Sequence, residues 1–544
     1  MSQRVLGDVP GNVITMGGTS FVGHPLLGGQ PKWVRRLAHT LYGAGYNSGA
    51  APLTGDGTAK TMAVNNYVNL SGAPINVASV VFQGWTLRTT GTTDASASYT
   101  VTGGIEYPVG TQIGTYSVTV NPGQNNFSTD VTLSTPIPAG ATFRVTGSAT
   151  PANAATYIAN LGFAGLRTYQ KSTLLKKLAL AAFGDSIFTN NNGAIINAAS
   201  SRCPAYLASI TGTTAATYGA SSAANFAKQA DLANVLGCTH VVTNFGTNDF
   251  GASTVLATLQ GYLTSMRDMV RGLGMKFVQA TMLVRTKSTS TAVTMTSVGA
   301  SSNIITATVP DASKFKVGAA YIIAGATETE YNGTKVCVAR NTGSNTVSFQ
   351  FTQGANAVAT GTITVTPWKV TMDIGFQEVY SSFYAAGGSS PRGLFNAWVR
   401  GGAFDDYIET ADPFEPSRDA GRWKVGGEDA SLPDYQLATV TSLVSTSRFV
   451  SNYSRGNATI PNGVVQPASG ANVGQLKGGS NNTGGDITAV SAFTSAFTVG
   501  DTVHCVPGVS YCSDDGTHPR VAGGAFGAQP LLDNAIAAWI DARV

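Results

Sequence analysis

Hydrophobic and polar residues alternate with a period of two along residues 58–150. Around Val118 and Val120, for example, every second residue is small or polar, which is typical of strands with one buried face. Turn signals containing Pro and Gly, at 121–123 and 138–140, recur at the spacing of a β-sandwich. We therefore predict that residues 58–150 form a β-sandwich domain of jelly-roll type.

The residues before this domain, 1–57, are interrupted by Gly and Pro and show no continuous pattern. One stretch, Trp33 to Leu37, is predicted to be helical, which would place His39 on an early helix. We treat residues 1–57 as a separate N-terminal segment. The segment contains neither the apolar core of a signal peptide nor a run long enough to span a bilayer.

Further along the chain, strands and helices are predicted to alternate. Continuous apolar runs at 178–183, 241–245 and 277–284 predict buried parallel strands. Between the last two runs, apolar residues within 255–270 recur at the spacing of one helix face. This alternation is typical of a doubly wound parallel sheet, so we assign residues 172–544 to an α/β domain.

Two segments interrupt the α/β pattern. Residues 286–366 contain threonine-rich strands and turns and are predicted to form an inserted β-module. Residues 437–506 are rich in Ser, Asn and Gly and are a second insert, β-like or loop-like. Outside the inserts we predict a helix at 394–399, a strand at 406–408 and a C-terminal helix at 530–542.

The composition adds that the chain is sparsely charged. Its 33 basic and 29 acidic residues give a formal net charge of +4, and only 11% of residues are charged, against roughly 25% in an ordinary soluble domain. No field of one sign indicates a nucleic-acid or membrane-surface partner. A low charge with 64 glycines favours extracellular or virion β-structure.

Cysteine usage does not indicate a disulfide framework, because only 5 cysteines occur in 544 residues. Cys505 and Cys512 are close enough in sequence to bridge a small loop, or they are free thiols. No Cys-x-x-Cys or His-x-x-x-His spacing indicates a metal site, so we expect neither a metal nor an organic cofactor.

The histidines offer one candidate for acid–base chemistry. They are His24, His39, His240, His504 and His518. Asp515 precedes His518 by three residues, and a short turn can place this carboxylate on one ring nitrogen while the other faces a serine nucleophile. Asp514, one residue further away, is an alternative partner. We interpret His39 and His240 as structural, and the remaining two lack a matching carboxylate.

Three short blocks occur in the order typical of a known family. They are Gly184-Asp185-Ser186-Ile187, Gly246-Thr247-Asn248-Asp249 and Asp515-Gly516-Thr517-His518-Pro519. On these blocks the chain resembles the SGNH hydrolase superfamily, often called GDSL esterases. The resemblance covers about 172–285, 367–436 and 507–544, and it implies a flavodoxin-like, three-layer α/β fold around a parallel sheet.

The resemblance also implies the role of each residue. Ser186 is expected to be the nucleophile, His518 the general base and Asp515 its partner. The oxyanion hole is expected to use the Ser186 backbone N–H, the Asn248 side chain and a backbone N–H from the family's second block. An amide donor just past a strand end can point at a developing oxyanion, while Asn248 and Asp249 would also suit a helix N-cap.

The second block is where the sequence departs from the family. If Thr217 replaces the family's usual asparagine, Ser222 falls at its usual glycine; serine can still donate its backbone N–H, and Gly219 is the alternative. The chain has no Gly-x-Ser-x-Gly elbow of an ordinary α/β-hydrolase, and residues 17–20 are a degenerate copy of the nucleophile block. Arg285, past the third strand, either contacts substrate or ends a strand at the surface.

Together these features predict a serine esterase that removes short acyl groups, O-acetyl above all, from a polysaccharide. A β-sandwich ahead of a hydrolase is a common way to hold an enzyme on a glycan. Residues 99–145 resemble jelly-roll domains found ahead of SGNH domains in bacterial and phage proteins, and residues 311–365 resemble small β-modules of phage tail proteins. We expect an extracellular or virion-associated enzyme with phage-tail or homo-oligomer contacts.

Two other functions fit the same sequence. One is a structural tail protein that binds glycan without catalysis, which the complete set of triad residues disfavours. The other is a lipase or thioesterase acting on longer acyl chains, which would need a broad apolar groove.

Overall fold

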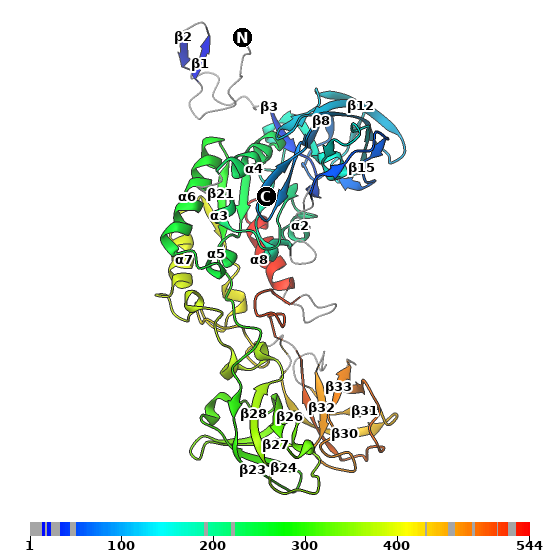
Figure 1. Cartoon of the computed structure of the whole chain (residues 1–544). Helices are drawn as coiled ribbons and strands as arrows, with labels where there is room; N and C mark the ends of the chain where they lie inside the picture. The colour runs from blue at the N-terminus through cyan, green and yellow to red at the C-terminus, as the bar shows by residue number, and fades with distance from the viewer. Residues whose placement is uncertain are drawn as a thin grey trace. The chain divides into compact units, whose positions relative to one another are not determined.

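The chain folds as a mixture of helices and many β-sheets (Figure 1). The computed structural model describes residues 13–16, 19–22, 33–43, 51–189, 194–218, 223–429, 432, 434–454, 463–480, 485–508, 510–520 and 529–544. The chain divides into two compact units, which are described separately. The first unit comprises Met1–Met282, Phe395–Thr410 and Leu532–Val544, and the second comprises Leu283–Leu394 and Ala411–Leu531.

The first unit contains two antiparallel sheets of five strands each. One has the order β12 (Gln112–Val120), β11 (Tyr99–Glu106), β15 (Thr142–Ala149) and β6 (Lys60–Thr61), with β7 (Asn66–Val68) also on β15. The other has the order β13 (Asn125–Phe127), β8 (Ile75–Gln83), β17 (Phe163–Lys171) and β3 (Trp33–Leu37), with β14 (Val131–Ile137) also on β8. The sheets contact each other through rings such as Phe82 and Tyr116, whose centroids are 5.9 Å apart.

The turns at 121–123 and 138–140 are confirmed, and each connects a strand of one sheet to a strand of the other: β12 to β13, and β14 to β15. Gly123 and Gly140 have φ values of 71° and 78°, a left-handed conformation that glycine adopts without a steric penalty. Three shorter pairs complete the antiparallel strands of this unit. They are β1 (Val13–Met16) with β2 (Thr19–Val22), β5 (Leu53–Thr54) with β16 (Thr156–Tyr157), and β9 (Trp85–Arg88) with β10 (Gly91–Asp94).

The predicted helix at Trp33 to Leu37 is wrong, because these residues form strand β3, which pairs antiparallel with β17. Exposure along the strand rises and falls with a period of two, and Leu37 is fully buried. Arg35 extends outward to a salt bridge of 2.7 Å with Asp130. Five residues cover little more than one helical turn, so the window was too short to separate a period of 3.6 from a period of 2. His39 therefore follows a strand, not a helix.

A six-stranded sheet, parallel throughout, forms the centre of the first unit. Its order is β29 (Asp406–Ile408), β21 (Lys276–Ala280), β20 (His240–Thr243), β18 (Leu180–Phe183), β19 (Ala205–Leu207) and β4 (Thr40–Tyr42). The predicted strands near 178–183, 241–245, 277–284 and 406–408 are confirmed. The three-residue strands β19 and β4 were not predicted. Strand β3 belongs to one five-stranded sheet and β4 to the parallel sheet, so residues 33–42 of the predicted N-terminal segment 1–57 contribute to two sheets of the first unit.

The described α-helices alternate along the chain with the strands of this sheet, and several of them contact it (Figure 1). They are α1 (Ser186–Thr189), α2 (Ala194–Ala199), α3 (Ala215–Tyr218), α4 (Ala223–Leu236), α5 (Thr247–Gly251), α6 (Leu256–Gly272), α7 (Pro391–Arg400) and α8 (Gln529–Asp541). Helix α6 contacts β21 and buries Leu259, Leu263, Met266 and Val270, which confirms the predicted apolar face. The predicted helices at 394–399 and 530–542 are also confirmed, as α7 and α8.

The second unit contains a seven-stranded antiparallel sheet between residues 293 and 367. The order is β22 (Val293–Thr294), β28 (Gly361–Pro367), β25 (Ala320–Ala326), β26 (Gly333–Asn341), β27 (Thr346–Gln350), β24 (Ile304–Thr308) and β23 (Thr296–Ser301). Its core buries Phe315, Tyr321 and Phe349. The first and last strands of this module pair with each other, with Val293 opposite Val365.

A closed six-stranded barrel occupies residues 436–506. Its order is β30 (Gln436–Leu443), β31 (Arg448–Ser451), β34 (Asp486–Ala489), β33 (Lys477–Ser480), β32 (Val464–Pro467) and β35 (Thr502–Val506). Here too the first and last strands pair, with Gln436 opposite Cys505. Cys505 belongs to the apolar core of the barrel, and both Cys505 and Cys512 are buried free thiols, so no disulfide joins them.

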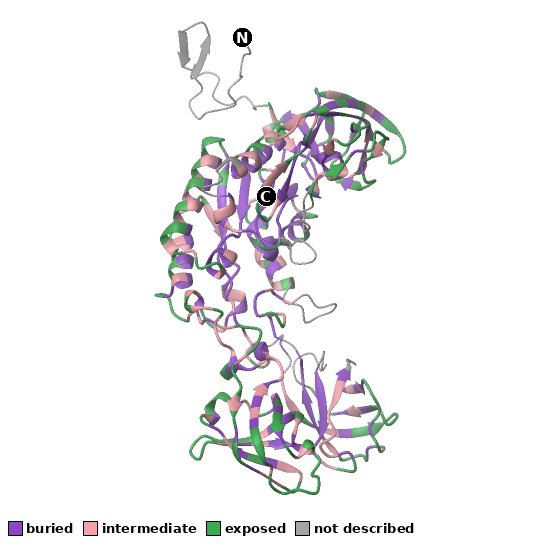
Figure 2. Ribbon diagram, in the orientation of Figure 1, coloured by how far each residue is buried: buried purple, intermediate pink, exposed green. Residues whose placement is uncertain are grey.

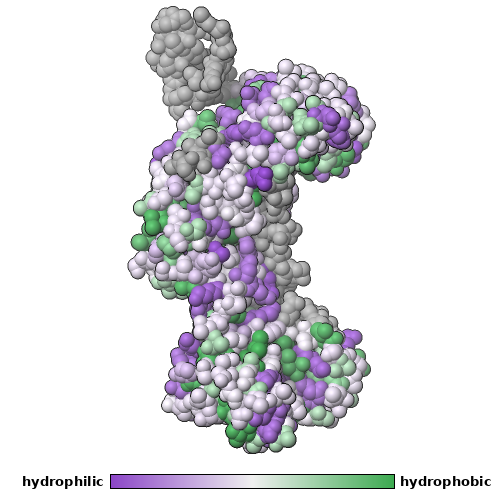
Figure 3. All heavy atoms as spheres, viewed as in Figure 1, coloured by the Kyte–Doolittle hydropathy of each residue, from purple (hydrophilic) through white to green (hydrophobic). Residues whose placement is uncertain are grey.

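Buried residues concentrate in the parallel strands of the first unit and in the strands of the two β-modules of the second (Figure 2). Hydrophilic and hydrophobic residues are interspersed over the face shown in Figure 3. In the part of the chain that the structure describes, no helix is both long enough and apolar enough to cross a membrane.

Candidate active site

Ser186 lies at the point where the chain turns out of the parallel sheet. Strand β18 ends at Phe183, and Ser186 is the first residue of α1. From β18 the chain passes to β19 on one side and later returns to β20 on the other. In open α/β sheets such a reversal leaves a crevice beyond the carboxyl ends of the strands, where ligands bind. Ser186 is 9% exposed at this edge.

The two residues before Ser186 are held by Asn244, which directly follows β20. The backbone N–H of Asp185 donates to Asn244 Oδ1 at 3.0 Å, and Asn244 Nδ2 donates to Asp185 Oδ1 at 2.6 Å. The same carboxylate oxygen accepts the backbone N–H of Ile187 at 2.9 Å. A Cβ on Gly184 would lie 1.9 Å from Asn244 Oδ1, so glycine is required there. These three hydrogen bonds fix the backbone on either side of Ser186.

Asn248 lies in α5, at the start of the next crossover, and is half-buried. Its Nδ2 donates to the carbonyl of Thr213 at 2.9 Å. The Thr213 hydroxyl in turn donates to the carbonyl of Gly184 at 3.0 Å. Thr213 thus connects Asn248 to Gly184, two residues before Ser186. The Asn248 amide supplies N–H donors at the same sheet edge as Ser186.

Asp249, the last residue of the Gly-Thr-Asn-Asp block, caps a different helix from its own. Its carboxylate accepts the backbone N–H groups of Ala215 at 2.9 Å and Ala216 at 3.1 Å, at the start of α3. Burial raises the pKa of Asp249, against the lowering effect of these backbone hydrogen bonds. The N-cap interpretation is therefore wrong for α5, whose N-cap is Gly246 without a side-chain cap: Asp249 binds the start of α3, and Asn248 makes a separate contact.

The other candidates for the oxyanion hole cannot be placed. Ser222 and Gly219 lie outside the described residues, and which of them donates a backbone N–H stays a prediction.

Asp515 and His518 form a close pair within one turn of the second unit. His518 Nδ1 is 2.5 Å from Asp515 Oδ2. The other carboxylate oxygen, Oδ1, accepts the Ser513 hydroxyl at 2.5 Å and the backbone N–H groups of Thr517 at 2.8 Å and His518 at 3.0 Å. Burial favours the neutral carboxyl, but these hydrogen bonds outweigh it and lower the pKa of Asp515. The turn therefore presents an ionised carboxylate to one imidazole nitrogen.

Asp514, the alternative partner, points to other cations. Its Oδ1 is 2.7 Å from Arg520 Nη2 and its Oδ2 is 3.3 Å from Lys369 Nζ. The structure thus favours Asp515 as the residue that orients His518.

The carbonyl oxygen of Gly516 connects this turn to the rest of the second unit by hydrogen bonds. That oxygen accepts the backbone N–H of Thr286 at 2.8 Å and the indole N–H of buried Trp423 at 3.3 Å. Gly516 has a φ of 74°, and a Cβ would lie 2.2 Å from the Thr286 carbonyl. Sequence reasoning missed Thr286 and Trp423, because neither belongs to a motif and both are distant from His518 in the chain.

Three of the remaining histidines are buried in structural positions. His39 Nε2 accepts the backbone N–H of Leu166 at 3.0 Å, His240 Nδ1 contacts the Thr239 hydroxyl, and His504 Nδ1 contacts the Tyr435 hydroxyl. Burial lowers the pKa of each of the three to about 4. His24 lies outside the described residues.

Two further candidates from the sequence are Arg285 and the degenerate block at residues 17–20. The Arg285 guanidinium lies over the Tyr380 ring, 3.9 Å from its centroid. Thr19 and Ser20 of the degenerate block belong to strand β2.

The two parts of the candidate triad lie in different units. Ser186 and Asn248 belong to the first, whereas Asp515 and His518 belong to the second. Each part is therefore described by its own contacts.

Comparison with known proteins gives partial structural similarities only. No family model matches the chain, and no curated protein matches it. The structure of TesA matches 20% of this chain and 62% of its own, at 23% identity and a TM-score of 0.17. A putative acylhydrolase from Bacteroides fragilis matches 20% of this chain and 50% of its own, at 19% identity and a TM-score of 0.17.

A family two carbohydrate esterase from Clostridium thermocellum, an active site mutant, matches 47% of this chain and 79% of its own. Its sequence identity is 14% and its TM-score is 0.16. The chain spans less than two thirds of the length of TesA and of the acylhydrolase. At these TM-scores the conclusion on function rests on the residues of the chain itself.

Proposed function

We propose that this chain is a serine ester hydrolase of the SGNH type, with Ser186 as nucleophile, His518 as general base and Asp515 as its partner. The observation that supports it most is the 2.5 Å contact between His518 Nδ1 and Asp515 Oδ2. A carboxylate held on Nδ1 leaves Nε2 unprotonated and able to accept a proton. The position of Ser186 at the switch point of a parallel sheet supports the same proposal.

In the proposed reaction, Ser186 Oγ attacks the ester carbonyl carbon while His518 Nε2 takes the hydroxyl proton. The oxyanion of the tetrahedral intermediate accepts N–H donors from the Ser186 backbone and the Asn248 side chain. His518 then protonates the leaving alkoxide as the carbon–oxygen bond breaks. Water attacks the acyl-enzyme by the same route in reverse and regenerates Ser186.

For the substrate, we propose short acyl groups, O-acetyl above all, on a polysaccharide. The low charge of the chain and its β-modules are compatible with an extended, uncharged substrate. An extracellular or virion-associated location, and contacts with a phage tail or a second copy, stay predictions.

Hydrolysis of p-nitrophenyl acetate tests the nucleophile and the base. We expect Ser186→Ala and His518→Ala each to lower kcat/KM by about 10³-fold or more, because members of a triad act as one unit. Ser20→Ala, in the degenerate copy of the motif, is the matched control and should retain activity. An unchanged rate in Ser186→Ala would refute the assignment.

Labelling by a fluorophosphonate tests whether the two parts of the triad act together. Wild-type protein should be modified at Ser186, and His518→Ala should be modified far more slowly, because the base that activates the serine is gone. Equal labelling in the two proteins would contradict the pairing. Acetyl and octanoyl esters then separate the substrate classes, since a clear preference for octanoyl would favour a lipase or thioesterase.

A further inference from the structure

A large hollow in the second unit adjoins the turn that contains His518. It has a volume of about 440 Å³ and is lined by eleven residues, among them Asp514, which directly precedes Asp515. A space of this size lies within the range of about 300–1,000 Å³ that is typical of small-ligand sites. All of its lining residues belong to the second unit.

The floor of this hollow is rigid sheet. Ile322 of β25 pairs with Thr366 of β28, and both line the space. Trp368 follows β28 directly, and its backbone N–H donates to the Ala320 carbonyl at 2.9 Å, so the sheet pairing extends to the tryptophan. The indole is half-buried: it packs against the apolar cluster that contains Ala320 and Val506, and it also lines the hollow.

Hydroxyl groups dominate the polar part of the lining. They belong to Ser288, Thr289, Ser290, Thr366 and Thr371. Ser288 and Thr289 are exposed and lie on a segment that Glu378 holds, through its salt bridge of 2.9 Å with Lys287. Hydroxyls both donate and accept hydrogen bonds, as the hydroxyls of a sugar do.

The charges at the hollow cancel. Its two charged lining residues, Lys369 and Asp514, are 3.3 Å apart and of opposite sign. The lysine ammonium is also 5.1 Å from the centre of the Trp368 ring. A lining without net charge does not select an anion. Four of the eleven lining residues are apolar: Ile322, Pro367, Trp368 and Val370.

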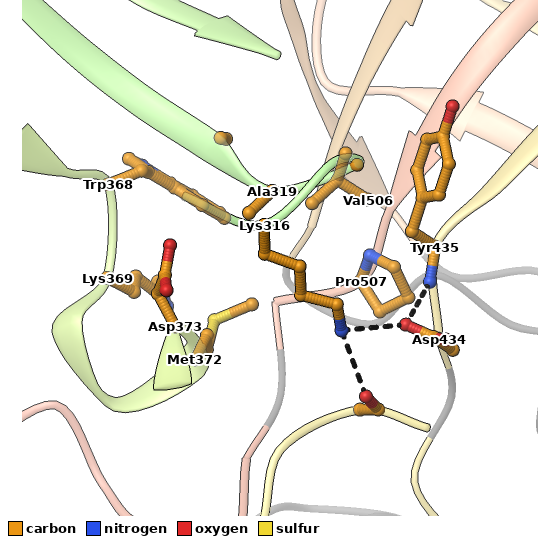
Figure 4. A pocket seen from close by; sticks show the side chains of 13 residues that line it. Lys316, Ala319, Trp368, Lys369, Met372, Asp373, Asp434, Tyr435, Val506 and Pro507 are labelled. Carbon is orange, nitrogen blue, oxygen red and sulfur yellow. Dashed lines mark hydrogen bonds and ion pairs between the residues drawn. The ribbon is translucent and has the colours of Figure 1, made fainter. Parts of the chain in front are cut away.

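Trp368 and Lys369 also line a much smaller pocket, of about 30 Å³, shown in Figure 4. There the Lys316 ammonium binds Asp434 Oδ1 and the Gly426 carbonyl, each at 3.0 Å. Protein groups already satisfy the polar atoms of this pocket, so the larger hollow is the better place for a ligand.

We propose that the larger hollow binds a segment of an uncharged polysaccharide. The bound segment neighbours the sugar residue whose acyl group is removed. The Trp368 indole packs against the C–H face of a sugar ring, and the surrounding hydroxyls bind its hydroxyl groups. This inference rests on the proposed esterase function for its link to catalysis, because Asp514 connects the hollow to the Asp515–His518 turn.

Kinetics on two substrates test the role of Trp368. For Trp368→Ala, we expect KM on acetylated glucomannan to rise about tenfold, the factor that corresponds to losing one aromatic packing contact. Its kinetics on p-nitrophenyl acetate should be unchanged, because that ester carries no sugar ring for the indole to bind. Trp33→Ala, which removes an exposed tryptophan of the first unit, is the control and should change neither. An unchanged KM on glucomannan in Trp368→Ala would overturn the proposal.

Affinity electrophoresis separates the failure of this proposal from the failure of the proposed function. Ser186→Ala protein should be retarded in gels containing glucomannan, and adding Trp368→Ala should abolish the retardation. That result supports the hollow even if the protein hydrolyses no ester. Retardation that persists without Trp368, or that occurs in alginate but not in glucomannan, would overturn it.

Discussion

The two oxygens of Asp515 have different partners, and this division has a chemical consequence. One oxygen faces the imidazole, while the other accepts three hydrogen bonds from its own turn. Burial raises the pKa of Asp515, but the bond to His518 and the three bonds of the turn together outweigh it, so the pKa is lowered and the ionised form is favoured. The pair is therefore organised to fix the tautomer of His518 before substrate binds.

The first prediction at this scale concerns that tautomer. Asp515→Asn should lower kcat/KM on p-nitrophenyl acetate by about 10³–10⁴-fold, because an amide no longer holds the proton on Nδ1. Asp311→Asn is the matched control, since Asp311 also accepts the Ser313 hydroxyl and backbone N–H two residues on, but in the β-module. A loss of similar size in both variants would point to a general effect on folding.

Local contacts of the candidate site could be predicted from the sequence, and distant ones could not. Asp515 and His518 are three residues apart, so the spacing alone indicated their contact, which the structure shows. Asn244 meets Asp185 across 59 residues, and Trp423 meets Gly516 across 93. Such contacts depend on strand order and on the path of the loops, which no short pattern specifies.

At the scale of elements, central strands were more predictable than edge strands. The strands β18 and β20 are buried throughout, and a continuous apolar run in the sequence indicates such a position. Strand β4 lies at the edge of the sheet, has three residues and includes an exposed tyrosine. Its placement depends on pairing with β19, and β19 is itself too short to show a period.

The turn at Gly516 supplies a prediction at this scale. Gly516→Ala should lower kcat/KM by about 10²-fold or more. The added Cβ would clash with the Thr286 carbonyl and displace the Asp515–His518 turn, and a displacement of about 1 Å is enough for such a loss. Gly500→Ala is the control, since Gly500 also has a positive φ of 99° but no neighbour within 4 Å of a Cβ. It should cost roughly 1–2 kcal/mol of stability, measured by urea unfolding, and leave activity intact.

For the whole molecule, buried neutral histidines make stability depend on pH. Burial lowers the pKa of His39 to about 4 from its ordinary value of 6.5. Between these values the unfolded chain binds a proton that the folded chain does not. The free energy of unfolding therefore has its full value above pH 6.5 and falls as the pH decreases towards 4. His240 and His504 act in the same direction.

Urea unfolding at several pH values tests this effect with His39→Gln. Glutamine does not titrate, and its amide can replace both the acceptor for Leu166 and the donor to Thr40. We expect the loss of stability between pH 6.5 and 4.5 to be smaller in the variant, by up to roughly 3 kcal/mol. Parallel curves for the two proteins would show that His39 does not contribute.

The pairing of first and last strands in each β-module has a consequence for how such a chain diversifies. Val293 lies opposite Val365, and Gln436 lies opposite Cys505, so each module begins and ends at neighbouring points. Residues paired across strands are only about 5 Å apart, so a module can be deleted or replaced without altering the distance that the rest of the chain must span. Recombination at the first of these junctions would replace Ile322, which lines the hollow, while Trp368, Ser186 and the parallel sheet stay as they are. Under the proposed function, swapping modules would alter which glycan is bound, while Ser186 would still perform the hydrolysis.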